Sequence, residues 1–138
     1  MYITREADYA VRCILFLSKE PERIISANEI SKSMIIPRSF VAKILQRLSG
    51  KGIVKSTQGV SGGFQLAKKP ARINLLEVIE AIQGPSAMSL CAIDKRICTL
   101  SGTCAVHPIW VELRGDVEKR LKRENFAKLV AKSKPNPC

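Results

Sequence analysis

The chain has 138 residues, 46% of them hydrophobic, and a formal net charge of +11. This length suits one domain with a core of its own, or a small domain with an oligomerisation arm. No stretch approaches the ~20 apolar residues that span a bilayer, and the start "MYITREADYAVRC" has no signal-peptide pattern, so we expect a cytoplasmic protein with no membrane partner.

The first half of the chain predicts three helices followed by a hairpin. Thr4 can cap a helix that runs to about Lys19. Ser26, with Glu29 three residues later, forms a capping box for a short helix, "ANEISKSM". Pro37 suits the first turn of a third helix, "RSFVAKILQRLSGKG", whose apolar residues fall on one face. The strand-like stretches "IVKSTQ" and "FQLAKK" then flank the turn "GVSGG", and this order is that of a winged helix-turn-helix.

The second half predicts helices on either side of a cysteine-rich loop. Asn74 and Glu77 begin a helix over "LLEVIEAIQ", a longer helix runs from about Cys104 to Lys122, and "NFAKLVAK" closes the chain. The fold class is therefore mostly α with a small β-hairpin, a winged helix-turn-helix plus a long C-terminal dimerisation helix. The predicted parts are a DNA-binding domain (1–84), a cluster-binding loop (85–103), the dimerisation helix with a short final helix (104–132) and a disordered tail (133–138).

Positive charge is concentrated in the winged-helix half. Between Ile30 and Leu76 there are nine basic residues and no acid. A one-signed stretch this long favours a polyanion partner, because each cation that neutralises a phosphate releases counterions; a basic surface kept for solubility is the alternative. A helix with long donors on its outer face can enter a major groove. We predict that double-stranded DNA contacts the third helix and the hairpin through Arg38, Ser39, Lys43, Gln46, Arg47, Lys51, Lys55, Ser56, Gln58 and Ser61.

The long helix predicts a homodimer. At ~1.5 Å per residue, its expected length is roughly 30 Å, more than a small winged helix needs. Pairing with a second copy would bury an apolar stripe and place two recognition helices about one DNA turn apart. The predicted interface residues are Val106, Trp110, Leu113, Val117 and Leu121.

Three cysteines and the only histidine lie in the segment "LCAIDKRICTLSGTCAVHPIW". Cys91, Cys98, Cys104 and His107 are separated by six, five and two residues. Zinc sites usually take ligands two to four residues apart, and only the last pair has that spacing. A disulfide switch would leave one cysteine over, whereas an iron–sulfur cluster, in which histidine can replace a thiolate, suits wider loops. The residues alone leave these three interpretations open.

Several stretches resemble the IscR-type (Rrf-type) bacterial transcription regulators. They are "ADYAVRCILFL", "GIVKSTQGVSGGFQL", "VIEAIQGP" and "CAVHPIW", and the resemblance extends to about Val130. It implies a winged-helix homodimer whose affinity for a DNA operator responds to an iron–sulfur cluster that senses iron–sulfur, redox or nitric oxide status. The chain departs from the pattern at Gln58, where an arginine is common, and near Ala42, where an acid is frequent. Both differences bear on which operator is bound.

The resemblance also implies a ligand set for the cluster. Cys91, Cys98 and Cys104 match its three-cysteine pattern, which favours a 2Fe–2S cluster with a 4Fe–4S cluster as the alternative. His107 matches the fourth ligand of the two-iron regulators, and Asp8 is the alternative used by some related sensors. Cys13 is expected in the core.

Other functions are not favoured by these residues. A cofactor-free thiol-redox or zinc-binding regulator on the same scaffold is the nearest alternative. An enzyme with a small-molecule substrate is not predicted, because the chain has no paired carboxylates, no nucleophile motif and a single histidine.

Overall fold

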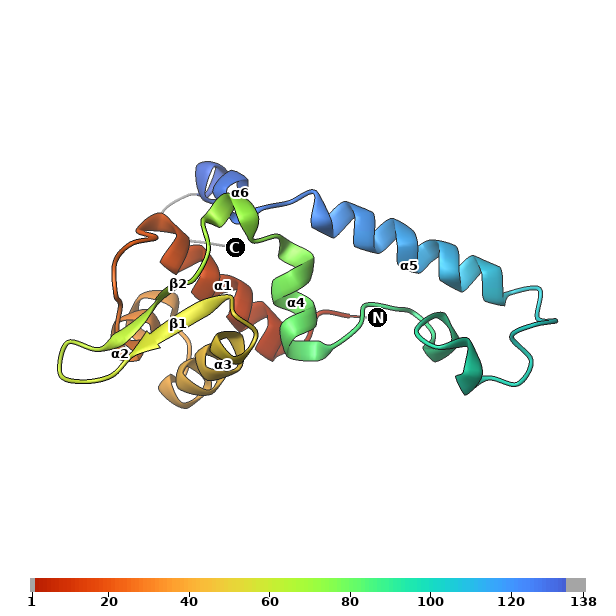
Figure 1. Cartoon of the computed structure of the whole chain (residues 1–138), viewed down its shortest axis with the longest axis horizontal. Coiled ribbons are helices and arrows are strands. Elements are labelled where there is room, and N and C mark those ends of the chain that lie inside the picture. Colours follow the sequence, from red (N-terminus) through yellow and green to blue (C-terminus); the bar gives the residue numbers. More distant parts are fainter. Residues whose placement is uncertain (1, 134–138) are drawn as a thin grey trace.

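The structure is a computed structural model that describes residues 2–133. It has a head of helices with a hairpin, and a long helix and loop that project from the head (Figure 1). Over these residues it is mostly helical with one two-stranded sheet, so the predicted fold class is confirmed. The predicted tail lies outside the described residues apart from Ser133, as does Cys138.

In chain order the elements are α1 (Arg5–Lys19), α2 (Ala27–Met34), α3 (Arg38–Gly50), β1 (Val54–Thr57), β2 (Gly63–Leu66), η1 (Pro70–Arg72), α4 (Leu75–Gln83), η2 (Leu90–Ala92), η3 (Lys95–Ile97), α5 (His107–Lys122) and α6 (Phe126–Lys132), where η denotes a short 3₁₀ helix.

Side-chain caps begin most of the helices in the head. Thr4 accepts a hydrogen bond from the Ala7 amide, and Asn74 with Glu77 forms the complete capping box expected for α4. The box expected for α2 is only half formed: Ser26 accepts from the Glu29 amide, but the Glu29 carboxylate pairs with Arg23 instead. The local sequence therefore determines where these helices start. In α2, the charge of Arg23 draws the Glu29 carboxylate away from the capping box.

The turn between α2 and α3 is held by one serine. Ser31 accepts the Ile36 amide at its carbonyl (3.1 Å), and its hydroxyl donates to the Ile36 carbonyl (2.6 Å). Ile35 has φ 56° and is 85% exposed, an uncommon conformation for a β-branched residue. Pro37 precedes α3 as its N-cap and does not lie in the first turn, so the predicted start moves by one residue.

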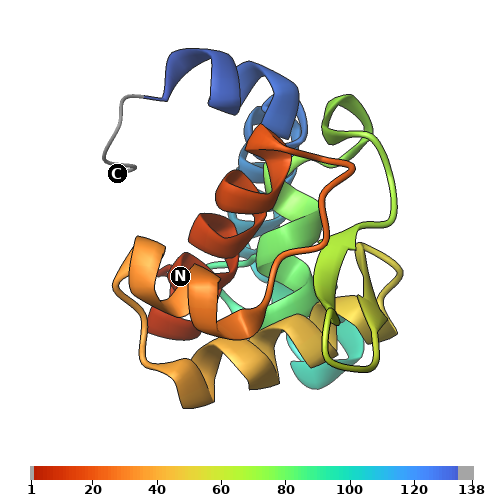
Figure 2. The same ribbon diagram turned by 90° about the vertical axis from the view of Figure 1, so that its left-hand side faces the viewer.

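The core of the head forms around α1. Figure 2 shows α1 in the middle of the head, with α3 below it and α6 above it. The side of α1 that faces these helices is fully buried, and Phe126 of α6 completes the core with no exposed surface. The buried residues of α1 with zero exposure are Ala7, Ala10, Cys13, Ile14 and Leu17.

The hairpin pairs β1 with β2 in antiparallel register, with Val54 opposite Leu66. It joins the rest of the head through Phe64, whose amide and carbonyl both bond to Ile25. Gly63 lies so close to this bridge that a Cβ atom would fall 2.4 Å from the Ile25 carbonyl oxygen. A glycine here is required by the hairpin itself, independently of any approach to a ligand.

The long helix α5 is shorter than predicted. It begins at His107, with Cys104 in the turn before it, and has 16 residues. At its other end the chain pairs with the start of α4, because the Leu75 amide donates to the Glu124 carbonyl (2.8 Å) and the Phe126 amide to the Ile73 carbonyl (3.0 Å). This pairing attaches α5 to the head.

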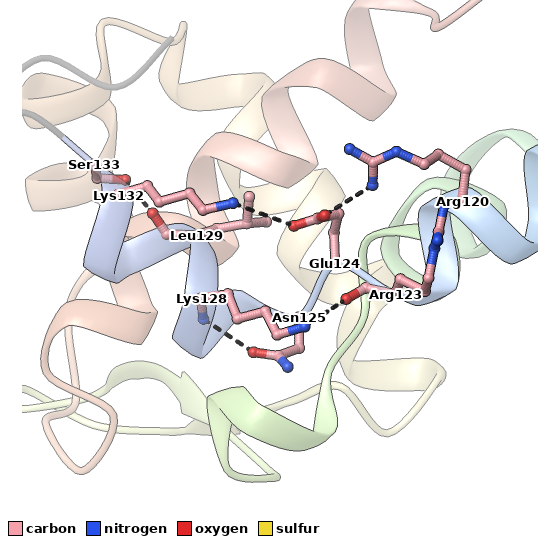
Figure 3. Close-up of polar contacts among 8 residues, drawn as sticks. All are labelled: Arg120, Arg123, Glu124, Asn125, Lys128, Leu129, Lys132 and Ser133. Carbon is pink, nitrogen blue, oxygen red and sulfur yellow. Dashed lines mark hydrogen bonds and ion pairs between the residues drawn. The ribbon is translucent and has the colours of Figure 1, made fainter.

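Charged side chains close around the same junction (Figure 3). Glu124 pairs with Arg120 at 2.7 Å and lies 4.0 Å from Lys132. The hydrogen bond from Arg120 lowers the pKa of Glu124. Asn125 caps α6 by accepting from the Lys128 amide.

Within residues 2–133 we find no helix that combines the length and the apolar character needed to cross a membrane.

Replacing Gly63 with alanine should lower the free energy of unfolding by about 1–3 kcal/mol, since the added methyl group meets backbone atoms that cannot rotate away. Urea denaturation measures the change. Gly50→Ala is the matched control, because nothing lies within 4 Å of a Cβ at that position. Its stability should stay the same or rise by up to about 1 kcal/mol. Equal losses in the two variants would contradict the close packing at Gly63.

Candidate functional site

The outer face of α3 carries most of the residues that the sequence predicts for DNA binding. Val41, Ile44 and Leu48 on the inner face are buried in the core. This burial fixes the helix so that its other side faces solvent. The exposed residues on that side are Arg38, Ser39, Ala42, Lys43 and Gln46.

Arg47 is used within the head. Its guanidinium donates to the Ile82 carbonyl from Nη2 (2.5 Å), and Nη1 lies 3.2 Å from Glu6 Oε2. The side chain thus joins α3 to α1 and α4. A contact between Arg47 and DNA remains a prediction, and it would require this bridge to open.

The hairpin lies beside α3, and the predicted wing residues are exposed. Lys51 follows the end of α3, and β1 packs against that helix. The turn between the strands carries no charge, and Val60 at its tip is fully exposed. Figure 1 shows α3 and the hairpin at the same end of the molecule. The exposed wing residues are Lys55, Ser56, Gln58 and Ser61.

Two of the nine cations in the acid-free window are neutralised by acids from outside it. Arg47 pairs with Glu6, and Lys68 pairs with Glu77 at 2.7 Å. In the described part of the chain, the other seven make no ion pair within 4.0 Å, so their charge stays available to an anion. These seven are Lys32, Arg38, Lys43, Lys51, Lys55, Lys69 and Arg72.

The cysteine loop lies at the far end of α5 from the wing (Figure 1). Cys91 is on η2, half-buried, with its Sγ 3.3 Å from Ser89 Oγ. Cys98 follows η3 and Cys104 ends a turn in which its amide donates to the Leu100 carbonyl, and both of these thiols are exposed.

The predicted metal ligands do not converge in this conformation. Across residues 2–133, no three His, Cys, Asp or Glu side chains are close enough to hold one metal ion. Asp8, the alternative ligand, pairs with Arg12 on α1 at 2.9 Å. His107 is the first residue of α5, and its Nδ1 is buried with no hydrogen-bond partner in the part of the chain that the structure describes. The donor types therefore suit an iron–sulfur cluster, but the loop would have to close to gather them.

Cys13 is a core residue, as the sequence predicts. Its side chain is fully buried in α1. Burial raises the pKa of the Cys13 thiol to about 12, so the group stays protonated at neutral pH. Cys13 therefore takes no part in thiolate chemistry with the loop.

The apolar stripe of α5 is half covered by its own chain. The side chains of Trp110, Leu113, Val117 and Leu121 are half-buried, because α5 packs against α4 and η2. At the open edge, Val106 is 42% and Ile109 51% exposed. Ile109 is not among the interface residues predicted from the sequence, although its spacing from Val106 and Leu113 (three and four residues) places it on the same side of the helix.

Comparisons with known proteins agree with this architecture. The family model Rrf2, described as "Iron-dependent Transcriptional regulator", matches residues 3–132. The chain is 28% identical over 108 residues to the HTH-type transcriptional regulator NsrR of Bacillus subtilis, covering 77% of this chain and 74% of NsrR. It is 32% identical over 124 residues to a protein of Aquifex aeolicus whose name describes an HTH-type transcriptional regulator, covering 88% and 86% of the two chains.

Solved structures show the same fold. CymR, the global cysteine regulator of B. subtilis, superposes with a TM-score of 0.78 at 20% identity, covering 97% of this chain and 99% of CymR. IscR of T. potens gives a TM-score of 0.76 at 18% identity, covering 97% and 89% of the two chains. The chain therefore belongs to the Rrf2 family of winged-helix, DNA-binding transcriptional regulators, which are not enzymes.

Proposed function

We propose that the chain is a homodimeric regulator that binds a specific operator in double-stranded DNA with an affinity set by an iron–sulfur cluster in the cysteine loop. The observation that carries this proposal is the spatial separation of two chemistries. Among residues 2–133, Arg38, Lys43 and Lys55 of α3 and the wing have no ion-pair partner, while three thiols and an imidazole nitrogen that makes no hydrogen bond lie at the far end of α5.

The DNA-binding part rests on the outer face of α3. Arg38, Lys43 and Gln46 project from a helix whose opposite side is locked into the core, so their positions are fixed before DNA arrives. Arginine, lysine and glutamine side chains can donate to base edges and phosphates in a major groove. Lys55 and the uncharged wing turn would contact the backbone or minor groove beside it.

The homodimer part rests on exposed apolar surface at the projecting end. Besides Val106 and Ile109, Leu90 (65%), Ile97 (55%) and Leu100 (64%) are exposed. Apolar residues gathered at one end of a molecule favour a protein partner. A second copy of α5 is the partner whose symmetry would also pair two DNA-binding heads.

The cofactor part rests on donor chemistry and on loop mobility. Residues 87–105 form only short 3₁₀ turns and bury few side chains. The free-energy cost of changing the loop conformation is therefore small. A bound cluster would supply a centre that reacts with oxygen and nitric oxide. The loop cysteines would bind it, and His107, at the N-terminus of α5, would supply the fourth ligand.

A cofactor-free thiol regulator is the second candidate. In this conformation Cys98 and Cys104 are exposed and do not form a cluster of metal ligands, as is expected of free reactive thiols.

Replacing Lys43 with alanine should weaken operator binding and reduce the slope of log affinity against log salt by about one, because one phosphate contact is lost. Fluorescence anisotropy with an operator selected from genomic DNA, measured over a range of salt, gives both quantities. Arg47→Ala, one turn along α3, is the matched variant. It should lower stability by about 1 kcal/mol or less through loss of its bridge and leave the salt slope nearly unchanged. A slope reduced by about one in Arg47→Ala and unchanged in Lys43→Ala would assign the phosphate contact to Arg47.

Replacing Ile109 with glutamate should convert dimers to monomers and reduce operator affinity at the same time, since a charge would have to be desolvated at the open edge of the α5 stripe. Sedimentation equilibrium reports the mass. Lys119→Glu places an acid on the exposed side of α5 and should remain dimeric. A folded Ile109→Glu variant that stays fully dimeric would place the subunit contact elsewhere.

Protein purified without oxygen and supplied with iron and sulfide should show visible sulfur-to-iron charge-transfer bands. The Cys91/Cys98/Cys104→Ala variant should lack them, whereas Cys13→Ala should keep them because that thiol is buried in the head. Operator affinity should differ between the cluster-loaded protein and the triple variant at equal salt. A wild-type protein without bands would favour the cofactor-free thiol regulator.

A further inference from the structure

Residues 87–105 are the part of the cysteine loop that carries the thiols, and they make one hydrogen bond to the rest of the molecule; nearer the head, the Ser86 amide donates to Glu80 on α4. Within residues 2–133, the hydrogen bonds of residues 87–105 stay inside that segment with one exception. Arg114 Nη1, on α5, donates to the Ala92 carbonyl on η2 at 2.8 Å. This contact is the polar link between α5 and the loop.

Arg114 also forms an ion pair on its own helix. Its Nε lies 2.8 Å from Glu118 Oε1, one turn along α5, and the two side chains are only 26% and 28% exposed. The Nε–H is not aligned on that oxygen for a hydrogen bond, so Glu118 holds the guanidinium by charge alone. Within residues 2–133, the directional hydrogen bond of the guanidinium is the one from Nη1 to Ala92.

The residues around this hydrogen bond pack as a small stack. Ala92 is 9% exposed, η2 packs on α5, and η3 packs on η2. Cys91 is the direct neighbour of Ala92, and its thiol is half-buried beside Ser89. The thiols of Cys98 and Cys104 are exposed. Of the three loop cysteines, Cys91 alone lies on an element that is anchored to α5.

We propose that Arg114 is a positioning residue that holds η2 against α5 and so keeps Cys91, one of the predicted cluster ligands, in a fixed place. The part of this role that concerns the cofactor rests on the proposed cluster. Cys98 and Cys104, on more exposed turns, would have to move toward Cys91 to hold a cluster with it. The positive charge of Arg114 also stays beside a segment that becomes anionic when thiolates bind iron, as outer-shell hydrogen-bond donors do at metal sites.

Hydrogen exchange in the full-length protein without added iron tests the anchoring step. In Arg114→Met, the η2 amides of Ala92, Ile93 and Asp94 should exchange about tenfold faster than in the parent, because local opening no longer breaks a charged hydrogen bond. The Cys104 amide, which bonds to Leu100 within its own turn, should change much less. Arg120→Met is the control, since that arginine pairs with Glu124 at the opposite end of α5. Unchanged exchange at η2 in Arg114→Met would overturn the proposal.

Cluster retention tests the functional step. With an iron chelator present, the visible bands of Arg114→Met should decay several-fold faster than those of the parent. Arg114→Lys should have an intermediate decay rate, because lysine keeps the positive charge but lacks the planar guanidinium with its several N–H donors. Equal decay rates would overturn the role of Arg114 in holding the cluster. If the parent itself shows no bands, the proposed cluster fails, and the exchange experiment still decides whether Arg114 anchors η2.

Discussion

The arrangement of the molecule depends on the short backbone pairing between residues 73–75 and 124–126. Two hydrogen bonds join these segments, and Phe126 next to them is fully buried in the core of the head. Without this pairing α5 would be held to the head only by its packing against α4 and by the chain connections. With it, the direction of α5 relative to α3 is fixed, so that the cysteine loop and the proposed DNA-binding face have a defined geometry. The charges around Glu124 reinforce the junction but, being exposed, contribute less than the buried ring.

The basic residues of the head have two roles: some form ion pairs within the protein, and the others remain available to an external anion. Arg47 and Lys68 come from the same acid-free window as the other cations, yet each is paired with an acid that approaches from another helix. Such pairs orient elements more than they stabilise them, since all four side chains are partly exposed. The remaining cations have no such partner in the structure described, and their mutual repulsion is relieved when a polyanion binds. The same set of basic residues thus supplies both contacts within the head and the proposed DNA-binding surface.

The sequence predicted the features that depend on residues close together in the chain, and it missed those that depend on residues far apart. Caps such as Thr4 and Asn74 act over three residues, so the helix starts of the head could be predicted closely. The pairing of Arg47 with Glu6 spans 41 positions, and nothing local indicates it. The start of α5 was placed too early because spacing alone cannot distinguish the turn at Cys104 from a helical turn. The spacing of the cysteines could not predict whether their thiols lie close together, because the loop conformation depends on contacts with distant residues such as Arg114.

The contacts also define a continuous route between the two ends of the molecule. From the cysteine loop it passes through Arg114 to α5, and from α5 through the pairing at Glu124 to the start of α4. There Glu77, part of the α4 capping box, holds Lys68 just after β2 of the wing. Each step is a hydrogen bond or ion pair, and the route passes from one helix to the next through the short connections at Glu124 and Lys68. Under the proposed function, a change in the loop that tilts α5 would have to act along these contacts to alter the relative positions of two DNA-binding heads.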